Sequence, residues 1–347
     1  MEHINHMNTQ KIRFALVGCG AIGARHAAVL DAEKGTTLIA LCDSNAGKAE
    51  ALSKTYGDLP VYTDYEKMLK EISAEVVIIA TPNGRHADMA IEAMERGFHV
   101  LVEKPMCLTE TEGKRMIETA RQRGVKLMVV KQNRFNAAVA FATRAIAEGR
   151  LGKIFMIQAN VLWNRRNEYY SESNWRGKKK EEGGALYTQA SHFIDLMALW
   201  CGKVTETQAA IATKNHEIET EDCGSALLRF TSGALGTLTW TTCVYEKNCE
   251  SSMTIIAEKG TVKIGGAYLN TIDLWRVEDY PLPKNAQFED APNHYAKYQG
   301  TSSNHDKVLR EVIKELTTGE GAVVTGEEGL VTVAAIEKIY ASAKDWS

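Results

Sequence analysis

The sequence predicts an α/β protein in which an N-terminal, doubly wound parallel sheet is followed by a second domain with a mainly antiparallel sheet. Strand-like and helix-like segments alternate up to about residue 131, as expected of parallel βαβ units. After about Gly152 most segments are strand-like and joined by short turns, which indicates antiparallel pairing. The chain has 347 residues, and at about 150 residues per domain this length suits two domains.

The alternation in the first part can be followed element by element. Strands are expected at residues 12–18, 37–43, 61–64, 76–82, 98–105 and 126–132. Most of them are near-continuous apolar runs, as in strands that are covered on both faces. Helices are expected between them at residues 22–30, 46–56, 65–71, 86–97 and 109–124. Thr109 is the expected N-cap of the last helix, with Glu112 at the capping-box spacing.

The second part begins with a long strand expected at residues 153–163 and a helix expected at residues 184–200, which ends at Cys201-Gly202. Residues 204–277 are mostly strand-like, with glycine-containing hairpin links at TSGAL and AEKGTV.

The end of the chain returns to helices. Residues 280–300 are polar and contain prolines, so a long surface loop is expected there. Two helices are expected at residues 303–317 and 327–343. The predicted domains are therefore residues 1–131 and 132–347, with the final helices able to pack back on the first domain.

Composition excludes several classes of protein. The 41 basic and 44 acidic residues give a net charge of −3, so no broad basic field is available to attract nucleic acid. No apolar run approaches the roughly 20 residues of a membrane helix. The polar N-terminal residues lack the apolar stretch of a signal peptide, so we expect a cytoplasmic protein. The seven cysteines form no CxxC pair, and no histidine–carboxylate cluster has metal-ligand spacing, so neither a disulfide framework nor a metal site is expected.

A dinucleotide-binding fingerprint follows the first expected strand. The pattern GxGxxG lies between that strand and a helix, which is the context that gives it weight. Its first glycine permits the tight turn, its second allows close approach of a pyrophosphate, and its third lets helix and strand pack closely. Free N–H groups at the helix N-terminus then favour phosphates. The residues expected to contact the cofactor here are Gly18, Gly20, Ala21, Ile22 and Gly23.

Asp43 identifies the expected cofactor as NAD. It ends the second strand, twenty residues after Gly23, where a carboxylate can accept hydrogen bonds from the adenosine ribose diol. A carboxylate would repel the 2′-phosphate of NADP, and the following Ser44 and Asn45 supply no cation beside it.

Three further segments resemble one known family. They are VVIIATPNGRHADMAIEAMERGFHVLVEKPM, KQNRFN and GGALYTQASHFIDL, and the chain is similar over nearly its whole length to the Gfo/Idh/MocA sugar and cyclitol dehydrogenases. The EKP motif, Glu103 to Pro105, is the most specific mark of this resemblance. The resemblance implies an N-terminal Rossmann domain and a C-terminal α/β domain with a large, open, mainly antiparallel sheet. It also implies a homo-oligomer that associates through exposed sheet faces, and a tetramer is the assumed size.

A closer resemblance lies in WNRRNEYYSESNWRG, TIIAEKGTVKIGG and TGEEGLVTVAAIEKIYASA. These segments resemble the branch of the family that oxidises UDP-N-acetylglucosaminuronic acid at its 3-position during bacterial O-antigen sugar synthesis. The branch tends to have proline where this chain has Arg166, and glycine where it has Asn304.

The resemblance implies that Lys104 and His192 are the catalytic residues. Lys104 lies at the carboxyl end of a strand, where ligands bind in doubly wound sheets, and burial beside a cationic nicotinamide would lower its pKa. The usual pKa of histidine, about 6.5, suits proton transfer by His192. The family usually has an aspartate four residues before this histidine, whereas this chain has Thr188. Either Lys104 or His192 is therefore left to accept the proton, and Asp195 is interpreted as structural.

The loop after the fourth strand completes the expected cofactor site. In the family this loop, here Thr81-Pro82-Asn83, lies along the dinucleotide, and Asn83 is expected to bind a ribose or phosphate. His86 is placed with the loop and is expected to cap or pack at the helix start. Glu103 is expected at the nicotinamide ribose, and the resemblance also implies a cis bond before Pro105.

Arginines are the expected anion ligands for a sugar acid, because a guanidinium binds carboxylate or phosphate in a planar fork. Arg165 and Arg176 gain weight from the aromatic residues between them, which can stack on uracil or a sugar. The expected substrate-binding residues are Lys104, Arg134, Arg165, Tyr169, Trp175, Arg176 and His192. Lys178 to Lys180 are interpreted as a solvated charge run. For His305 a pocket role and a structural role remain equally open.

Three functions remain in competition at this stage. The first is NAD-dependent oxidation of the 3-hydroxyl of a UDP-linked N-acetylated glucuronic acid. The second is a dehydrogenase of the same family that acts on a free sugar or inositol. The third is a non-catalytic, NAD-sensing binding protein, which the replacement at Thr188 keeps open.

Overall fold

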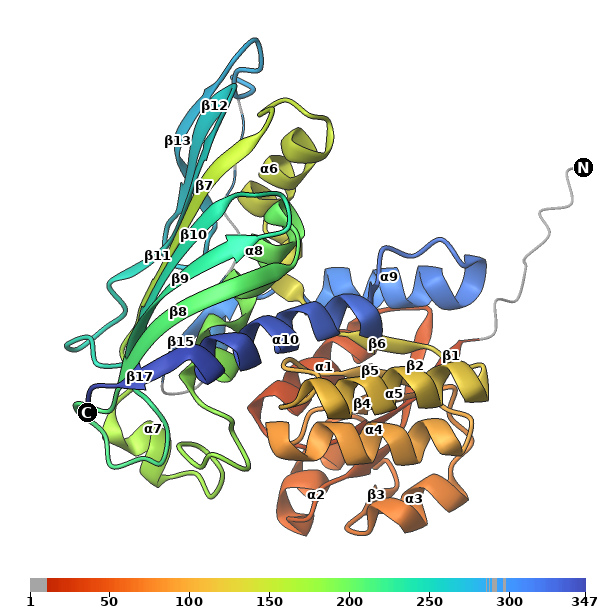
Figure 1. The fold of residues 1–347 in the computed structure, drawn as a ribbon. Helices are drawn as coiled ribbons and strands as arrows, with labels where there is room; N and C mark the ends of the chain where they lie inside the picture. Colours follow the sequence, from red (N-terminus) through yellow and green to blue (C-terminus); the bar gives the residue numbers. More distant parts are fainter. Residues whose placement is uncertain (1–10, 285, 287, 289–291, 296–297) are drawn as a thin grey trace, which may run out of the picture.

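A computed structural model of the chain describes residues 11–284, 286, 288, 292–295 and 298–347. It contains a seven-stranded sheet and an eight-stranded sheet, each covered by helices (Figure 1). The predicted α/β class, with a parallel sheet first and a mainly antiparallel sheet second, is confirmed.

The seven-stranded sheet has the strand order β16-β6-β5-β4-β1-β2-β3. All neighbours pair in parallel except β16, which is antiparallel to β6. Its strands are β1 (Ile12–Val17), β2 (Thr36–Cys42), β3 (Val61–Tyr62), β4 (Val76–Ile79), β5 (His99–Val102), β6 (Leu127–Val129) and β16 (Val324–Thr325). Its crossover helices are α1 (Ala21–Ala32), α2 (Ala46–Thr55), α3 (Tyr65–Glu71), α4 (His86–Glu95) and α5 (Glu110–Arg123).

The strands of this sheet are buried on both faces, as their continuous apolar sequences predict. Along β1, Phe14 and Leu16 join one core with residues of α1 and of α9 (His305–Thr318). The alternate residues Ala15 and Val17 join a second core with residues of α4 and α5. This alternation follows from the period of two in a strand.

Helix α5 is capped at its start by the residues that the sequence predicts. The Thr109 hydroxyl accepts from the Glu112 backbone N–H while the Glu112 carboxylate accepts from the Thr109 N–H, so the predicted capping box closes the start of α5. Gly124 ends the same helix in the left-handed conformation, with φ of 65°.

The eight-stranded sheet has the order β13-β12-β11-β7-β10-β9-β8-β17. Its neighbours are antiparallel except for β10 with β7 and β17 with β8. The strands are β7 (Ile154–Leu162), β8 (Val204–Ala212), β9 (Cys223–Phe230), β10 (Leu235–Thr241), β11 (Glu250–Ala257), β12 (Gly260–Gly265), β13 (Thr271–Val277) and β17 (Ala343–Asp345).

Helices cover one face of this sheet and leave the other face open (Figure 1). The covering helices are α6 (Ala137–Ala147), α8 (Ser191–Cys201) and α10 (Gly326–Ser342). On the open face, Met156 of β7 pairs in register with Leu235 of β10 and with Ile256 of β11. These three side chains and Leu227 are exposed, each by 40–58%. We call these four residues the open-face apolar patch.

The end of the chain joins the two sheets. Helix α9 packs on α1, and α10 contacts α5 of the first sheet as well as α8 and β8 of the second. The short strand β16 between these helices pairs with β6. The final helices therefore lie against the N-terminal layer (Figure 1).

Three elements differ from the sequence-based expectations. No helix or strand is expected from the sequence at residues 137–147, yet α6 forms there, as its alanine-rich sequence favours. The helix expected at residues 184–200 begins as a π-helical turn over Leu186–Ala190 before α8 continues it. Within the expected loop 280–300, β14 (Pro292–Tyr295) pairs with β15 (Tyr298–Ser302).

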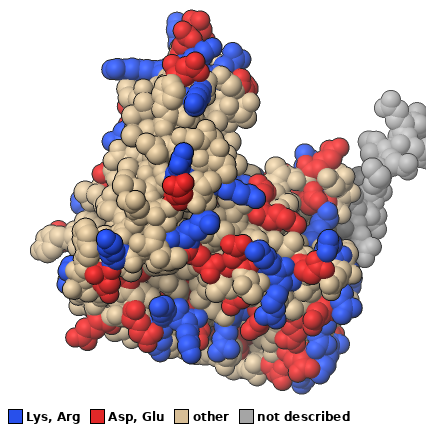
Figure 2. Space-filling view, viewed as in Figure 1, with Lys and Arg blue, Asp and Glu red and all other residues tan. Residues whose placement is uncertain are grey.

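Charged side chains of both signs are interspersed over the face shown in Figure 2, as the nearly balanced count of acids and bases implies. Among the described residues, no helix is both long enough and apolar enough to cross a membrane.

Candidate active site

A cavity of about 920 Å³ lies at the carboxyl ends of the parallel strands. It reaches from the glycine turn after β1, past the ends of β2, β4 and β5, to a segment of the second domain that starts at Trp163 and ends at His192. The strand order places β2 and β4 on opposite sides of β1, and this topological switch point is where ligands bind in such sheets.

The glycine turn is shaped for a ligand rather than for a side chain. Gly18 has φ of +93°, and a Cβ there would lie 2.4 Å from the carbonyl oxygen of Ala80. A Cβ on Gly23 would lie 1.8 Å from the carbonyl oxygen of Gly18. Gly20, by contrast, has open space where a Cβ would stand, and no side chain caps α1 at this residue. Uncapped N–H groups beside open space fit the pyrophosphate of a dinucleotide.

Asp43 lies beside this turn, at the end of β2. Its two carboxylate oxygens accept hydrogen bonds of 2.8 Å from the backbone N–H groups of Cys19 and Asn45. Each oxygen keeps a lone pair that can accept a ribose hydroxyl. Lys48, in the first turn of α2, also lines this part of the cavity. This cation was not predicted from the sequence, because it lies five residues beyond Asp43 rather than next to it.

The loop after β4 lines the cavity with Thr81, Pro82, Asn83 and His86. The Asn83 amide does not reach freely into the cavity, because it donates a 2.8 Å hydrogen bond to the carbonyl of Glu182.

The buried His86 ring lies between two backbone carbonyls, 2.7 Å from that of Pro105 and 2.9 Å from that of Thr81. It therefore ties the loop after β4 to the EKP segment. The bond between Lys104 and Pro105 is cis, as expected.

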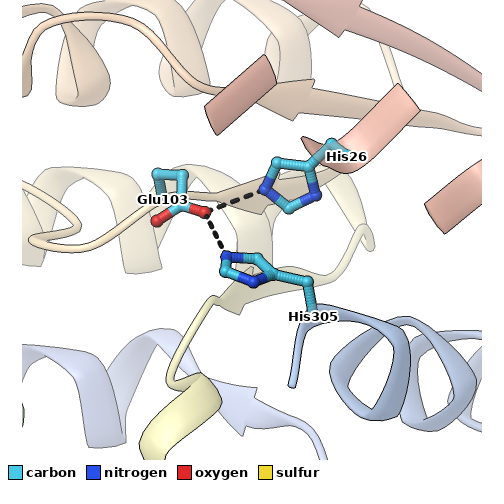
Figure 3. Close-up of side chains that lie close together, drawn as sticks. All are labelled: His26, Glu103 and His305. Atoms are coloured by element: carbon cyan, nitrogen blue, oxygen red, sulfur yellow. Dashed lines mark hydrogen bonds and ion pairs between the residues drawn. The ribbon is translucent and has the colours of Figure 1, made fainter. Parts of the chain in front are cut away.

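Glu103 is held in a buried cluster with two histidines (Figure 3). Its Oε1 atom lies 2.8 Å from Nε2 of His26 on α1 and 3.3 Å from Nε2 of His305 on α9. Burial opposes ionisation, but the two histidines hold the pKa of Glu103 well below its usual range. The cluster joins the glycine-turn helix, the end of β5 and the start of α9. Only Glu103 of the three lines the cavity, so His305 has the structural role.

Two groups of side chains in the described part of the chain have atoms close enough to share a metal ion, namely His26–Glu103–His305 and His216–Asp222–Cys243. In both groups the carboxylate is already paired with an imidazole.

Lys104 points into the cavity and is held at its amine. Nζ donates a 2.8 Å hydrogen bond to the backbone carbonyl of Thr188. Burial, reinforced by the positive charges of Lys131 and Arg165 and opposed by Glu103, lowers the pKa of Lys104 to about 8. About a tenth of the amine is therefore free at pH 7 and about half at pH 8, so the form that a general base requires is available in this range.

His192, the second residue of α8, lines the same cavity and is 2% exposed. The Gln132 amide lies 3.4 Å from its Nε2 atom. Burial, followed by the charges of Lys104 and Lys131, lowers the pKa of His192 well below its usual range. The ring is therefore neutral near pH 7, whereas Lys104 titrates close to that range.

Arg134 does not line the cavity, in contrast to the expectation that it binds a substrate anion. Its guanidinium binds Asp195 at 2.8 and 3.0 Å and Glu328 at 3.1 Å. Asp195 also accepts from the hydroxyl of Thr332 and lies 3.4 Å from Lys131 Nζ, which gives it a structural role. Arg134 is not available to a substrate anion because two carboxylates from distant segments, Asp195 and Glu328, already engage its planar fork.

The other expected substrate residues come together in the cavity. Tyr169, in the short helix α7 (Asn167–Ser171), lies between two guanidinium groups. The Arg176 guanidinium carbon is 4.0 Å from the centre of its ring, and that of Arg165 is 5.4 Å away. Trp175 also faces the Arg176 guanidinium, at 5.4 Å. We call Arg165, Tyr169, Trp175 and Arg176 the arginine–aromatic cluster.

Gln189 fixes this cluster and was missed in the sequence analysis. Its Oε1 atom accepts a 2.7 Å bond from Arg165, and its amide donates a 2.9 Å bond to the Tyr169 hydroxyl. Gln132, beside His192, was missed as well. A signal was available for both: Gln189 lies three residues before His192, and Gln132 follows a parallel strand at its carboxyl end.

Two family models match the chain, each over one of its two sheets. The NAD-binding Rossmann fold of an oxidoreductase family matches residues 12–131. The C-terminal alpha/beta domain of the same family matches residues 143–346.

Solved structures with similar folds cover nearly all of the chain. The WlbA dehydrogenase from Bordetella pertussis, in complex with NADH and UDP-GlcNAcA, is 38% identical with a TM-score of 0.87, and 96% of each chain is covered. The WlbA dehydrogenase from Chromobacterium violaceum, in complex with the same two molecules, is 37% identical with a TM-score of 0.88, covering 97% of this chain and 94% of that one.

A curated relative aligns with part of the chain. D-glucoside 3-dehydrogenase of Escherichia coli K12 is 30% identical over 190 residues. This alignment spans 54% of the present chain and 54% of that relative.

Proposed function

Because this chain belongs to the Gfo/Idh/MocA family of NAD-binding oxidoreductases, we propose that it oxidises the 3-hydroxyl of a UDP-linked N-acetylated glucuronic acid. The reaction would serve the synthesis of sugars for a bacterial surface polysaccharide. The observation that carries the proposal is the arginine–aromatic cluster, which shares one cavity with Lys104 and His192. Similarity to two dehydrogenases solved with UDP-GlcNAcA supports it.

The arginine–aromatic cluster suits a nucleotide-sugar acid for a physical reason. Such a substrate carries a carboxylate, a diphosphate and a uracil ring. Arg165 and Arg176 offer planar donors for the anionic groups, and aromatic faces offer stacking surfaces. Stacking on Tyr169 and the bond to Gln189 hold the Arg165 fork in place before substrate arrives, so less side-chain entropy is lost on binding.

The proposed chemistry uses the difference between the two basic groups. When bound, NAD supplies the acceptor for the hydride that leaves the sugar carbon. Lys104, with a pKa near 8, takes the proton from the 3-hydroxyl. The neutral His192 ring offers a hydrogen-bonding nitrogen to a sugar hydroxyl. A buried lysine amine of lowered pKa in the cavity argues against the non-catalytic alternative.

The test is product analysis with purified protein, NAD and UDP-N-acetylglucosaminuronic acid. We expect NADH absorbance to rise and mass spectrometry to show a product two mass units lighter, with the keto group at position 3. The matched comparison is UDP-N-acetylglucosamine, which has no carboxylate and is expected to turn over far more slowly. Free glucosides and inositols complete the panel. Turnover of a free sugar without turnover of the uronate would reject this substrate in favour of the second function.

We propose further that the enzyme is a homo-oligomer that covers the open-face apolar patch. A contiguous apolar surface on an otherwise polar sheet commonly marks a protein interface, and four exposed side chains of this kind lie on one face of the sheet. Light scattering after gel filtration is expected to give a multiple of the 38.3 kDa chain mass, with a tetramer as the working size. Leu227→Asp with Leu235→Asp is expected to shift it toward the monomer.

The seven cysteines are all free. Free thiols are the usual state in a reducing compartment, which supports the proposal that this enzyme works in the cytoplasm.

A further inference from the structure

A buried carboxylate, Glu182, lies next to Thr188, the residue whose backbone carbonyl holds the Lys104 amine. The residue four positions before His192 is Thr188, which carries no carboxylate. In the fold, the Thr188 hydroxyl lies 2.9 Å from Oε1 of Glu182, six residues earlier in the chain. The same threonine binds Lys104 Nζ at 2.8 Å through its backbone carbonyl. One residue thus connects the carboxylate to the amine.

Two glycines make the connection possible. Gly183 and Gly184 have φ of +89° and +123°, which lets the chain turn back so that Glu182 faces the π-helical turn containing Thr188. A Cβ on Gly184 would lie 2.2 Å from the hydroxyl of Tyr340, so the turn also depends on a small residue. Single π-turns are frequent at functional sites.

Hydrogen bonds hold both the side chain and the backbone of Glu182. The side chain is 2% exposed, and its Oε2 atom accepts the backbone N–H of Gly177. Its own N–H donates to the Lys178 carbonyl at 2.8 Å, and its carbonyl accepts from Asn83 of the cofactor loop at 2.8 Å. Glu182 does not line the cavity, so it is placed to act through its neighbours rather than on a ligand.

The hydroxyl of Thr188 has a single proton and two acceptors, Glu182 Oε1 and the carbonyl of Gly184, each at 2.9 Å. When Glu182 is ionised, the hydroxyl can donate to it. When Glu182 is protonated, the acid donates to the threonine oxygen and the hydroxyl donates to Gly184. The contact survives in both states, so it can hold the Thr188 peptide while protons move nearby.

The charge of Glu182 also acts on the amine. Four charged groups influence Lys104: Glu103 and Glu182 stabilise the ammonium form, whereas Lys131 and Arg165 disfavour it, as does burial. The neighbouring His192 is neutral near pH 7. Burial raises the pKa of Glu182, and Arg176 and Lys104 oppose that rise. Glu182 and Lys104 are therefore coupled, and loss of the carboxylate favours the free amine.

We infer that Glu182 is a positioning residue for Lys104: through the hydroxyl of Thr188 it fixes the backbone carbonyl that holds the amine. This inference rests on the proposed role of Lys104 in sugar oxidation.

The first test compares Glu182→Gln, Glu182→Asp and Glu182→Ala by the pH dependence of kcat and KM. Glutamine keeps an acceptor but no charge, and loss of the charge favours the free amine. The rising part of the kcat–pH profile should therefore move to lower pH by about 0.5 to 1 unit. Alanine removes the anchor, and kcat should fall about tenfold or more with little change in KM, because a misplaced base mainly affects the chemical step. Aspartate keeps the charge on a shorter side chain. Its kcat–pH profile should rise over the same pH range as that of the wild type, at a reduced kcat.

The matched control is Glu221→Gln, which alters another buried carboxylate near the same helix. Glu221 binds the Leu186 N–H, the Tyr340 hydroxyl and the Trp240 indole, and it does not line the cavity. We expect the kcat–pH profile of Glu221→Gln to rise over the same pH range as that of the wild type. Thermal melting of all variants separates loss of fold from loss of rate.

A second readout does not require turnover. Competitive labelling with trace acetic anhydride, read by mass spectrometry of the Lys104 peptide across pH, reports the pKa of the amine directly. Failure of the wild type to oxidise the uronate would reject the proposed function, while the labelling would still test Glu182. An unchanged Lys104 titration in folded Glu182→Gln, together with unchanged kcat in Glu182→Ala, would overturn the inference.

Discussion

The Asp43 carboxylate accepts a 2.8 Å hydrogen bond from the backbone N–H of Cys19. This contact joins the end of the second strand to the glycine turn after the first, so the two halves of the dinucleotide fingerprint form one rigid unit. A carboxylate held in this way already has a fixed orientation before any ligand binds.

Asp43→Ala is therefore expected to weaken NAD binding by about 10- to 100-fold, since hydrogen bonds to charged groups contribute about 1.5–3 kcal/mol. Isothermal titration calorimetry measures the change. Glu50→Gln, on the exposed side of α2, is the control and should bind NAD as the wild type does. A Kd for Asp43→Ala within about twofold of the wild-type value would contradict the assignment.

The second and third glycines of the fingerprint should respond differently to alanine. At Gly20 the Cβ would meet open space, so Gly20→Ala should keep the wild-type Tm but lose NAD affinity, because the methyl group would occupy the path of the pyrophosphate. At Gly23 the Cβ would lie 1.8 Å from a backbone carbonyl, so Gly23→Ala should lower the Tm by several degrees. Thermal melting and calorimetry on both variants decide; a Gly20→Ala variant that binds NAD normally would argue against this turn as the phosphate site.

Oxidation should accelerate as pH rises through the titration of Lys104. Burial lowers its pKa to about 8, so the free amine increases between roughly pH 7 and 9 and kcat should increase with it. Lys104→Ala should lose at least about 100-fold in kcat at pH 8. Lys126→Ala, which removes a lysine paired with Glu315 away from the cavity, is the control. Retention of half the activity by Lys104→Ala would rule out its role as base.

A positive charge without a planar guanidinium should not be enough for substrate binding at Arg165 and Arg176. Arg165→Lys and Arg176→Lys keep the positive charge but lose the planar fork and its stacking on Tyr169, so KM should rise about tenfold with a smaller effect on kcat. Arg229→Lys changes an arginine that pairs with Glu206 outside the cavity and should leave KM unchanged. The comparison requires steady-state kinetics with the uronate; an equal KM in all three variants would refute anion recognition by the cluster.

Stability should fall at alkaline pH because of His216. Its Nδ1 atom lies 3.1 Å from Asp222 and its Nε2 atom 2.7 Å from the carbonyl of Arg165, so both ring nitrogens face acceptors and both must carry protons to bond. Although burial disfavours the charged ring, Asp222 and the other acceptors raise the pKa of His216 to about 9.

A folded-state pKa raised above the unfolded value of about 6.5 gives stability that is complete below that pH and is lost as the pH rises through about 9. Urea unfolding at pH 6 and pH 9.5 should show the wild type losing on the order of 2 kcal/mol more than His216→Asn. Parallel pH dependence in the two proteins would exclude a charged His216.

The cofactor half of the site was predictable because its determinants are local. A strand, a tight glycine turn and a helix are neighbours in sequence, and Gly18 needs its positive φ whatever else the chain does. The capping box at Thr109 was predictable for the same reason. The loop at Thr81 and the EKP lysine followed from the family resemblance, and both line the cavity.

The substrate half was only partly predictable. Arg134 and Arg165 are both predicted from the sequence to bind a substrate anion, yet Arg134 is bound by Asp195 and Glu328 whereas Arg165 lines the cavity. The difference depends on partners 61 and 194 residues away from Arg134. No pattern of spacing reports which acidic side chains will reach a given guanidinium.

The amino-acid sequence alone determined the two-sheet architecture, the family and NAD as cofactor, because short apolar runs, glycines and motifs encode these features within a few residues. The catalytic role of Lys104 and His192 stays a prediction, and the structure brings both residues to one cavity. The tertiary structure decided which charges are available: it paired Arg134, buried Glu103 between two histidines, and placed Glu182 against Thr188. The physical reason is that desolvation and ion pairing depend on distances in space, and those distances are set only when segments far apart in the chain pack together.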